Sequence, residues 1–271
     1  MRIWWQSSTP LDRPAMADYR SHLVAYVTSV KRPDTEIHFS GVDDGSLALD
    51  YEAVVELNSM APGGVLHKVI QAQADGFDVV AIGCMLDPAL LAARELVGIP
   101  VVSFGETTIH VACMLGDRVS GVAFSDKQAG RYTRQAAAMG LRDRVVPFGS
   151  LGIDFPTLAG SFRDPGPMVE AFEEVARRLV AQGTEVIIPA CATLDLFLAE
   201  ARVDEVHGAR VLHADATLLK MAETFGDLAR LGVTTSRALK YAGPTGSRRE
   251  AVLDTYGIQP RTGVGARTHA D

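Results

Sequence analysis

The sequence predicts an α/β protein of two pseudo-symmetric lobes, each a mostly parallel sheet flanked by helices, with the active site between them. The first observation is a segment that occurs twice, as Asp78-Val-Val-Ala-Ile-Gly-Cys84 and as Glu185-Val-Ile-Ile-Pro-Ala-Cys191. In both copies an acidic residue opens a run of β-branched and small apolar residues, and an amphipathic Leu/Ala-rich segment follows the cysteine. The pattern is typical of a buried parallel strand that leads into a helix.

The second observation is that the similarity continues beyond the cysteines. In each copy a helical segment is followed by another apolar run, Gly98–Ser103 or Gly208–His213, and then by a further helix. The cysteines lie 107 positions apart, too far for a solenoid unit. The spacing fits two lobes that face each other, with one cysteine from each at the cleft. The alternative is that the likeness reflects only what all parallel α/β strands share.

Apolar periodicity and turn residues predict the elements in order. The expected strands are residues 2–5, 36–40, 79–83, 100–104, 119–124, 144–148, 186–189 and 208–213. The expected helices are residues 15–30, 66–74, 89–97, 106–115, 127–139, 168–181, 194–203 and 216–229. Residues 41–60 are polar and irregular, and either cover a cleft or form an ordinary surface excursion. We expect residues 1–104 to form lobe 1, completed by 209–271, and residues 105–208 to form lobe 2.

Composition limits the classes of function. The chain has 271 residues, of which 47% are hydrophobic, and a net charge of −7 with a pI near 5.5. No basic stripe follows any predicted helix, so nucleic acid is not expected as a partner. No apolar run reaches membrane-spanning length, and the N-terminus enters a strand without a signal-peptide core. We expect a small-molecule substrate and no membrane partner.

The cysteines indicate the compartment and the chemistry. Three cysteines in a chain of this length do not form a disulfide framework, so we expect a reducing, cytoplasmic location. No Cys/His spacing suggests a metal, and no cofactor motif is present. A lone cysteine is most often a small buried hydrophobe, and Cys113 receives that interpretation. A disulfide between Cys84 and Cys191 is the other structural alternative.

The matched placement of Cys84 and Cys191 favours acid–base catalysis. Two thiols that face one cleft can remove a proton from one face of an acidic carbon and return a proton to the other. Each cysteine is predicted at the start of a helix, where the thiol pKa is lowered and backbone N–H groups point into the site. Those donors would stabilise an enolate-like intermediate. The reaction inverts a stereocentre.

On these residues the chain resembles the aspartate/glutamate racemase superfamily, and within it the hydantoin racemase branch. The similarity lies in Ile82–Pro88, in Gly98-Ile-Pro-Val-Val with Gly105-Glu106, in Gly183–Ala192, and in the closing segment from Ala222 to Arg237. It covers roughly residues 1–242, and the two cysteines are its most specific part.

The resemblance implies a cofactor-independent racemase or epimerase with Cys84 and Cys191 as its two acid/base residues. It also implies substrate contacts from the residues that end the first strand of each lobe, and from the positions after each cysteine. These substrate-binding residues are Ser7, Ser8, Met85, Ser125, Asp126, Ala192 and Thr193. The alternatives for three of them are local: Ser7 and Ser8 could each cap a turn, and Asp126 could cap a helix.

Three departures from the branch pattern bear on the substrate. The first strand ends in Gln6-Ser7-Ser8-Thr9-Pro10, Pro189-Ala190 precedes the second cysteine, and His213 stands where an aspartate is common. The alternative enzyme is a cis–trans isomerase of a maleate-type dicarboxylate, in which one cysteine adds to the double bond. The alternative outside catalysis is a two-lobed small-molecule binding protein. We expect the tail after Gly243 to be partly ordered or to pack on a neighbouring subunit, and the protein to be a homo-oligomer.

Overall fold

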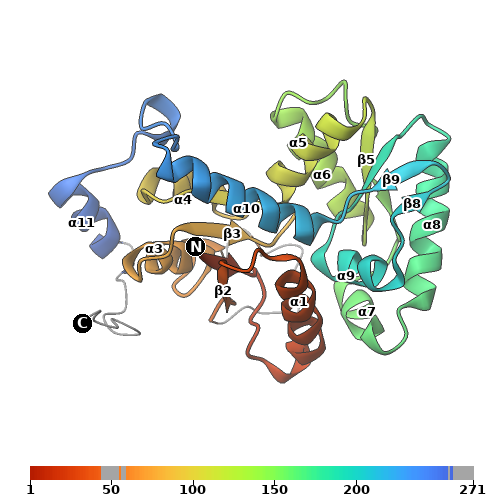
Figure 1. Ribbon diagram of the computed structural model, residues 1–271, viewed down its shortest axis with the longest axis horizontal. Helices are drawn as coiled ribbons and strands as arrows, with labels where there is room; N and C mark the ends of the chain where they lie inside the picture. Colours follow the sequence, from red (N-terminus) through yellow and green to blue (C-terminus); the bar gives the residue numbers. More distant parts are fainter. Residues whose placement is uncertain (44–54, 56–58, 256, 259–271) are drawn as a thin grey trace.

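The computed structural model describes residues 1–43, 55, 59–255 and 257–258, and consists of two sheets with helices around them (Figure 1). The first sheet has the strand order β2-β1-β3-β4, and all its strands are parallel. The second has the order β6-β5-β7-β9-β8, and only β8 runs antiparallel to its neighbour. The predicted α/β class with two lobes is confirmed. The polar segment 41–60 lies largely outside the described residues.

The first lobe is built around four short strands whose residues are mostly buried. The strands are β1 (Arg2–Gln6), β2 (Glu36–Ser40), β3 (Val79–Ile82) and β4 (Val101–Ser103). Around them lie η1 (Pro14–Met16), α1 (Ala17–Val30), α3 (Val65–Ala74) and α4 (Leu90–Leu96). The short helix α11 (Gly246–Thr255), after η3 (Leu239–Tyr241), returns to this lobe, where Leu253 and Ile258 join its apolar core.

The second lobe repeats this order of elements. Its strands are β5 (Val119–Ala123), β6 (Gly149–Ser150), β7 (Val186–Pro189), β8 (Glu205–Val206) and β9 (Ala209–Val211). Its helices are α6 (Asp126–Ala138), α7 (Phe155–Ala159), η2 (Gly160–Arg163), α8 (Gly166–Val180) and α9 (Ala192–Ala201). Strands β6, β5, β7 and β9 stand in the same relation as β2, β1, β3 and β4, so the internal repeat extends to the topology.

Two helices cross between the lobes. Helix α5 (Phe104–Leu115) follows β4 of the first sheet but packs against β7 and β5 of the second. Helix α10 (Ala214–Arg230) follows β9 of the second sheet and packs along β3 and β4 of the first, as Figure 1 shows for the long blue helix in front of β3. The two helices also pack on each other. One continuous apolar core therefore contains buried residues of both sheets and of both crossing helices.

The predicted strand Arg144–Phe148 is wrong. Only Val145 bridges to Val119, and regular pairing with β5 begins at Gly149. Pro147 has no N–H to give to the ladder, and the Phe148 N–H donates to Thr133 Oγ1 at 3.0 Å. Both features interrupt the regular pairing with β5 before the two-residue strand β6 forms.

The predicted strand Gly208–His213 contains β9, which pairs with β8 in a hairpin that the sequence analysis did not predict. His207 and Gly208 have φ values of 51° and 88°, the left-handed pair that a two-residue hairpin turn requires. The turn pairs β8 with β9 at the edge of the second sheet. The expected lobe boundary at residue 208 thus separates Ala209–Val211 from the sheet in which these residues pair. We propose that the chain returns to lobe 1 from Ala214.

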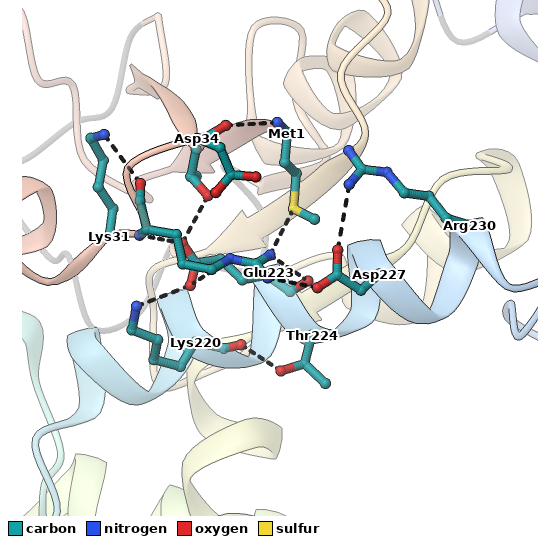
Figure 2. Close-up of polar contacts among 10 residues, drawn as sticks. Met1, Lys31, Asp34, Lys220, Glu223, Thr224, Asp227 and Arg230 are labelled. Carbon is teal, nitrogen blue, oxygen red and sulfur yellow. Dashed lines mark hydrogen bonds and ion pairs between the residues drawn. The ribbon is translucent and has the colours of Figure 1, made fainter.

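The carboxylate of Glu223 anchors α10 to the first lobe (Figure 2). Its side chain is 2% exposed. It accepts hydrogen bonds from the Arg32 N–H at 2.8 Å, Thr35 Oγ1 at 2.8 Å and Lys220 Nζ at 3.0 Å. Next to it the Arg32 guanidinium pairs with Asp227 at 2.7 Å. These contacts fix the middle of α10 on the loop that precedes β2. Among the described residues no helix is long and apolar enough to cross a membrane.

We expect Glu223→Gln to lower stability without moving the lobes. The amide retains one acceptor oxygen but brings an NH2 group toward three donors. Leaving a buried donor unsatisfied costs about 1–3 kcal/mol. Urea unfolding followed by circular dichroism measures the loss. An unchanged midpoint would contradict the anchoring role.

Candidate active site

Each of the matched cysteines lies directly after a central strand. Cys84 follows β3, and its N–H donates to the Ile82 carbonyl at 3.0 Å in a tight turn. Cys191 follows β7 and is the N-cap residue of α9. Both are free, half-buried thiols, as is Cys113. Cys113 packs against the core on α5, in agreement with the structural interpretation given to it.

One cavity of about 40 Å³ contains both Cys84 and Cys191 in its lining. A buried water needs at least about 10–15 Å³ of such space, so the cavity has room for solvent between the two thiols. Five predicted substrate-binding residues also line it: Ser7, Ser8, Met85, Ala192 and Thr193. Residues from the ends of β1, β3, β5 and β7 therefore meet at one place between the two sheets.

Ser125 and Asp126 lie outside this lining. Ser125 is the N-cap of α6, and its Oγ accepts the Gln128 N–H at 3.4 Å. Asp126 is exposed in the first turn of the same helix. Strand β5 ends at Ala123, so Phe124 occupies the place that Ser7 has after β1, and Phe124 lines the cavity instead. The Ser125 side chain therefore caps α6 and is not part of the cavity lining.

Several lining residues had no distinguishing signal in the sequence. They are Thr9, Met16, Tyr19, Gly83, Leu86, Phe124, Gln128, Tyr132, Phe155 and Ala190. Tyr19 lies on the buried face of α1, where helical spacing predicts only core packing. Gln128 lies in the first turn of α6, and Phe155 lies at the start of the short helix α7. The position of these side chains depends on how the two lobes pack against each other.

Tyr19 is a buried polar group near both thiols. Its side chain is 6% exposed and hydrogen-bonded to Ser7, whose Oγ is 2.8 Å from Thr9 Oγ1. Burial raises the pKa of the Tyr19 phenol well above its usual value, and the nearby Asp215, Cys191 and Cys84 raise it further. The phenol is therefore a neutral hydrogen-bond donor beside both sulfur atoms.

The lining is neutral apart from the cysteines and tyrosines themselves. None of the described lining residues is Asp, Glu, Lys, Arg or His. Gln128 is 1% exposed, and its Oε1 has no hydrogen-bond partner among the described residues. A buried acceptor without a partner costs free energy that a ligand N–H would recover. The cavity thus suits a small neutral ligand that carries N–H groups.

The environment of Cys191 differs from the sequence expectation. Burial raises the pKa of its thiol to about 12, although the Thr193 and Leu194 N–H groups at the start of α9 lower it. The negative charges of Cys84 and Asp215 raise it further. The helix start was expected to lower the thiol pKa, but loss of hydration outweighs two backbone hydrogen bonds. Cys191 is a protonated thiol at neutral pH.

Asp87 connects the Cys84 turn to both lobes. Its carboxylate accepts the N–H groups of Gly105 and Glu106, each at 2.7 Å, and Gln135 Nε2 of α6 at 2.6 Å. Burial raises the pKa of the Asp87 carboxyl to about 7 despite these donors. Glu106 itself pairs with Arg94 at 2.5 Å, and both side chains are partly buried.

Asp195 has the corresponding place after Cys191. Its fully buried carboxylate lies 3.1 Å from His213 Nδ1 and accepts the Asp215 N–H at 2.8 Å. Burial lowers the pKa of His213, but hydrogen bonds and charges from Asp195 and Asp204 outweigh burial and raise it. Burial and then the charge of Asp195 raise the pKa of Asp215 well above its usual value. His213 thus bridges two carboxylates and does not line the cavity.

This geometry defines a class: a two-lobed α/β protein that presents one thiol from each lobe to a neutral cavity. Residues 14–222 match the Asp/Glu/Hydantoin racemase family, and the chain belongs to it. The resemblance found in the sequence is confirmed. No group of three or more potential metal ligands occurs within the described part of the chain.

Individual relatives agree with this assignment. The hydantoin racemase of Pseudomonas sp. is 28% identical over 205 residues, covering 73% of this chain and 77% of that protein. The hydantoin racemase of Rhizobium meliloti is 27% identical over 228 residues, covering 79% and 85%. The structure of allantoin racemase from Klebsiella pneumoniae superposes with a TM-score of 0.73 at 23% identity, covering 91% and 94%, which establishes a common fold.

The pKa of Cys191 predicts its reactivity. We expect its alkylation rate by iodoacetamide to rise steadily up to about pH 10, because the thiolate fraction keeps increasing below the pKa of about 12. Peptide mass spectrometry measures the rate at each pH. A free cysteine peptide, whose rate levels off near its pKa of about 8.5, is the control. A plateau for Cys191 near that value would contradict the burial argument.

The raised pKa of Asp87 predicts a pH-dependent stability. Between its usual value of 3.8 and about 7 the folded protein holds a proton that the unfolded chain has released. Wild type should therefore lose stability relative to Asp87→Asn as pH rises through this window, and the difference should stay constant above it. Urea midpoints of both proteins across the window test this. A difference that does not change with pH would show that Asp87 titrates normally.

Proposed function

We propose that the protein is a cofactor-independent racemase or epimerase of a small neutral carbonyl compound, of the hydantoin type, with Cys84 and Cys191 as its two bases. The observation that supports it best is that two free thiols, one from each lobe, line a single cavity. The family and the hydantoin racemases among its relatives support the same reaction class. The free thiols also support a reducing, cytoplasmic location.

The chemistry requires one thiolate and one thiol. The thiolate of Cys84 takes the proton from the stereocentre, and the C–H electron pair moves into the adjacent carbonyl to form an enolate. The thiol of Cys191 then gives its proton to the opposite face of that carbon, and the carbonyl re-forms. The cycle leaves Cys84 protonated and Cys191 as the thiolate, ready for the other enantiomer. Because the pKa of Cys191 is high, its thiol is protonated before the reaction and takes the acid role in this proposal.

Backbone and hydroxyl donors would hold the enolate oxygen. Met85 and Ala192 follow the two cysteines and line the cavity, where their N–H groups can act as these donors. Ser7, Ser8 and Thr193 would place the ring by hydrogen bonds, and the Tyr19 phenol would add a neutral donor. Removal of one such donor typically costs about 100- to 1,000-fold in turnover.

The neutral lining favours a hydantoin-like ring over a dicarboxylate. A maleate-type substrate needs cations for its two carboxylates, and the described lining has none. The unpaired Gln128 Oε1 can accept a ring N–H. The high pKa of Cys191 is the one observation that favours the alternative, a two-lobed binding protein with inert cysteines. Turnover of a hydantoin would distinguish a racemase from a binding protein.

The test is racemisation in deuterated water. A single enantiomer of a 5-substituted hydantoin should lose optical rotation and gain deuterium at the stereocentre, measured by polarimetry and mass spectrometry. A panel with different 5-substituents, including the ureido group of allantoin, defines the side group. Folded protein that exchanges no member of the panel would refute the proposal, and ligand binding without exchange would favour the receptor.

The cysteine variants test the two-base assignment. We expect Cys84→Ser and Cys191→Ser each to abolish racemisation, because a serine hydroxyl neither ionises near neutral pH nor replaces the missing thiol. Cys191→Ser, which keeps the proposed Cys84 base, should still exchange deuterium into the one enantiomer whose proton faces Cys84, whereas the high pKa of Cys191 leaves Cys84→Ser without an ionised thiol. Cys113→Ser, outside the cavity, is the matched control and should keep wild-type activity. Full activity in either active-site variant would rule out the pair.

A further inference from the structure

We propose that Asp87 and Asp195 are a matched pair of positioning residues, each tying the turn of one cysteine to the start of the helix that crosses to the other lobe. Asp87 lies three positions after Cys84, and Asp195 lies four positions after Cys191. Neither residue lines the cavity. Their proposed role in catalysis rests on the proposed function, whereas their control of the thiol positions does not.

In the first lobe the connection runs from Asp87 to α5. The Gly105 and Glu106 N–H groups at the start of α5 would have no intrahelical acceptor, and Asp87 supplies one for each. The N-cap residue Ser103 makes no side-chain cap of its own. Asp87 also has a φ of 51°, a left-handed conformation that costs an aspartate energy and that the three donors to its carboxylate maintain.

Gly105 shows how closely this turn is packed. A Cβ atom there would lie 2.2 Å from the Met85 carbonyl oxygen and 2.6 Å from Gln135 Nε2. Any other residue at this position would push Met85, the neighbour of Cys84, out of place. The α5 start, the cysteine turn and α6 of the opposite lobe therefore meet around one carboxylate.

In the second lobe the connection runs from Asp195 to α10. Asp195 accepts the N–H of Asp215 at the start of α10, and its other oxygen lies 3.1 Å from His213 Nδ1. The N-cap residue here, His213, also makes no side-chain cap. In both lobes the acceptor for the N-terminal N–H groups of the crossing helix is an aspartate that lies 18–20 positions earlier in the chain, three or four residues after the cysteine.

These contacts matter because each of them reaches a helix that packs on the opposite lobe. Because α5 packs on the second sheet and α10 on the first, each carboxylate fixes its cysteine turn relative to the opposite lobe. The pair thus sets the relative position of the two sulfur atoms. An asparagine keeps only one acceptor oxygen: at position 87 its NH2 group would face a donor, and at position 195 it would face His213 Nδ1 or the Asp215 N–H. Either change would loosen the contact. Misplacement of a catalytic group by about 1 Å can cost about 100-fold in rate.

The experiment compares Asp87→Asn and Asp195→Asn with Glu223→Gln, which loses a similarly buried carboxylate on α10 far from the cysteines. Each variant is incubated with each hydantoin enantiomer in deuterated water, and rates are normalised to the folded fraction. Asp87→Asn should slow exchange of the enantiomer served by Cys84 about 10- to 100-fold more than that of its mirror image, and Asp195→Asn should do the reverse. Glu223→Gln should leave the ratio at the wild-type value.

A second measurement does not depend on turnover. Iodoacetamide labelling with peptide mass spectrometry gives the rate of each cysteine separately. We expect the cysteine on the released turn to react about tenfold faster, a change of about one pKa unit, while the other thiol is unchanged. If a variant does not fold, Gln135→Ala and His213→Ala, which each remove one partner of a carboxylate, replace it.

The outcomes separate the two proposals. Selective labelling without any exchange, in wild type as well, supports the positioning role and refutes the proposed reaction. Equal effects on both thiols and both enantiomers, or effects no larger than those of Glu223→Gln, would overturn the positioning role and leave the proposed reaction standing.

Discussion

The crossing of α5 and α10 is the constraint on which the rest of the structure depends. Each helix starts at the end of one sheet and buries its apolar face on the other, so the two lobes share a single core. Separation of the lobes along this core would expose Ile109, Ala112, Leu218 and Leu219, all fully buried. The cavity between the cysteines is therefore held by helices whose N-termini adjoin the cysteine turns.

The neutral cavity makes ionisation of its own side chains less favourable. Its lining is neutral and excludes water, which raises the pKa of Cys191 and of Tyr19. The same loss of hydration makes every hydrogen bond to a developing enolate stronger. The unpaired oxygen of Gln128 fits this environment, because a site built to bind a ligand leaves one acceptor without a protein partner.

The repeated segment could be found in the sequence because its signal is local. β-branched runs, a turn and a helix start lie within a dozen residues of each cysteine, and the matched strand order confirms the repeat. The same local reasoning failed at Arg144–Phe148, where a donor from Thr133 redirects the backbone, and at His207-Gly208, where a two-residue turn makes a hairpin. Ser125, which was predicted to bind ligand, caps α6, and the residue before it, Phe124, lines the cavity.

The sequence by itself determined the α/β class, the two lobes and the pair of cysteines, since these depend on periodicity and on residues that follow one another. Only the tertiary structure decided which side chains surround the thiols and how strongly they ionise. Tyr19 and Gln128 come from helices of different lobes, and burial, which no local pattern encodes, sets the pKa of Cys191. The links from Asp87 to α5 and from Asp195 to α10 likewise join positions 18–20 residues apart, across turns whose geometry arises from packing.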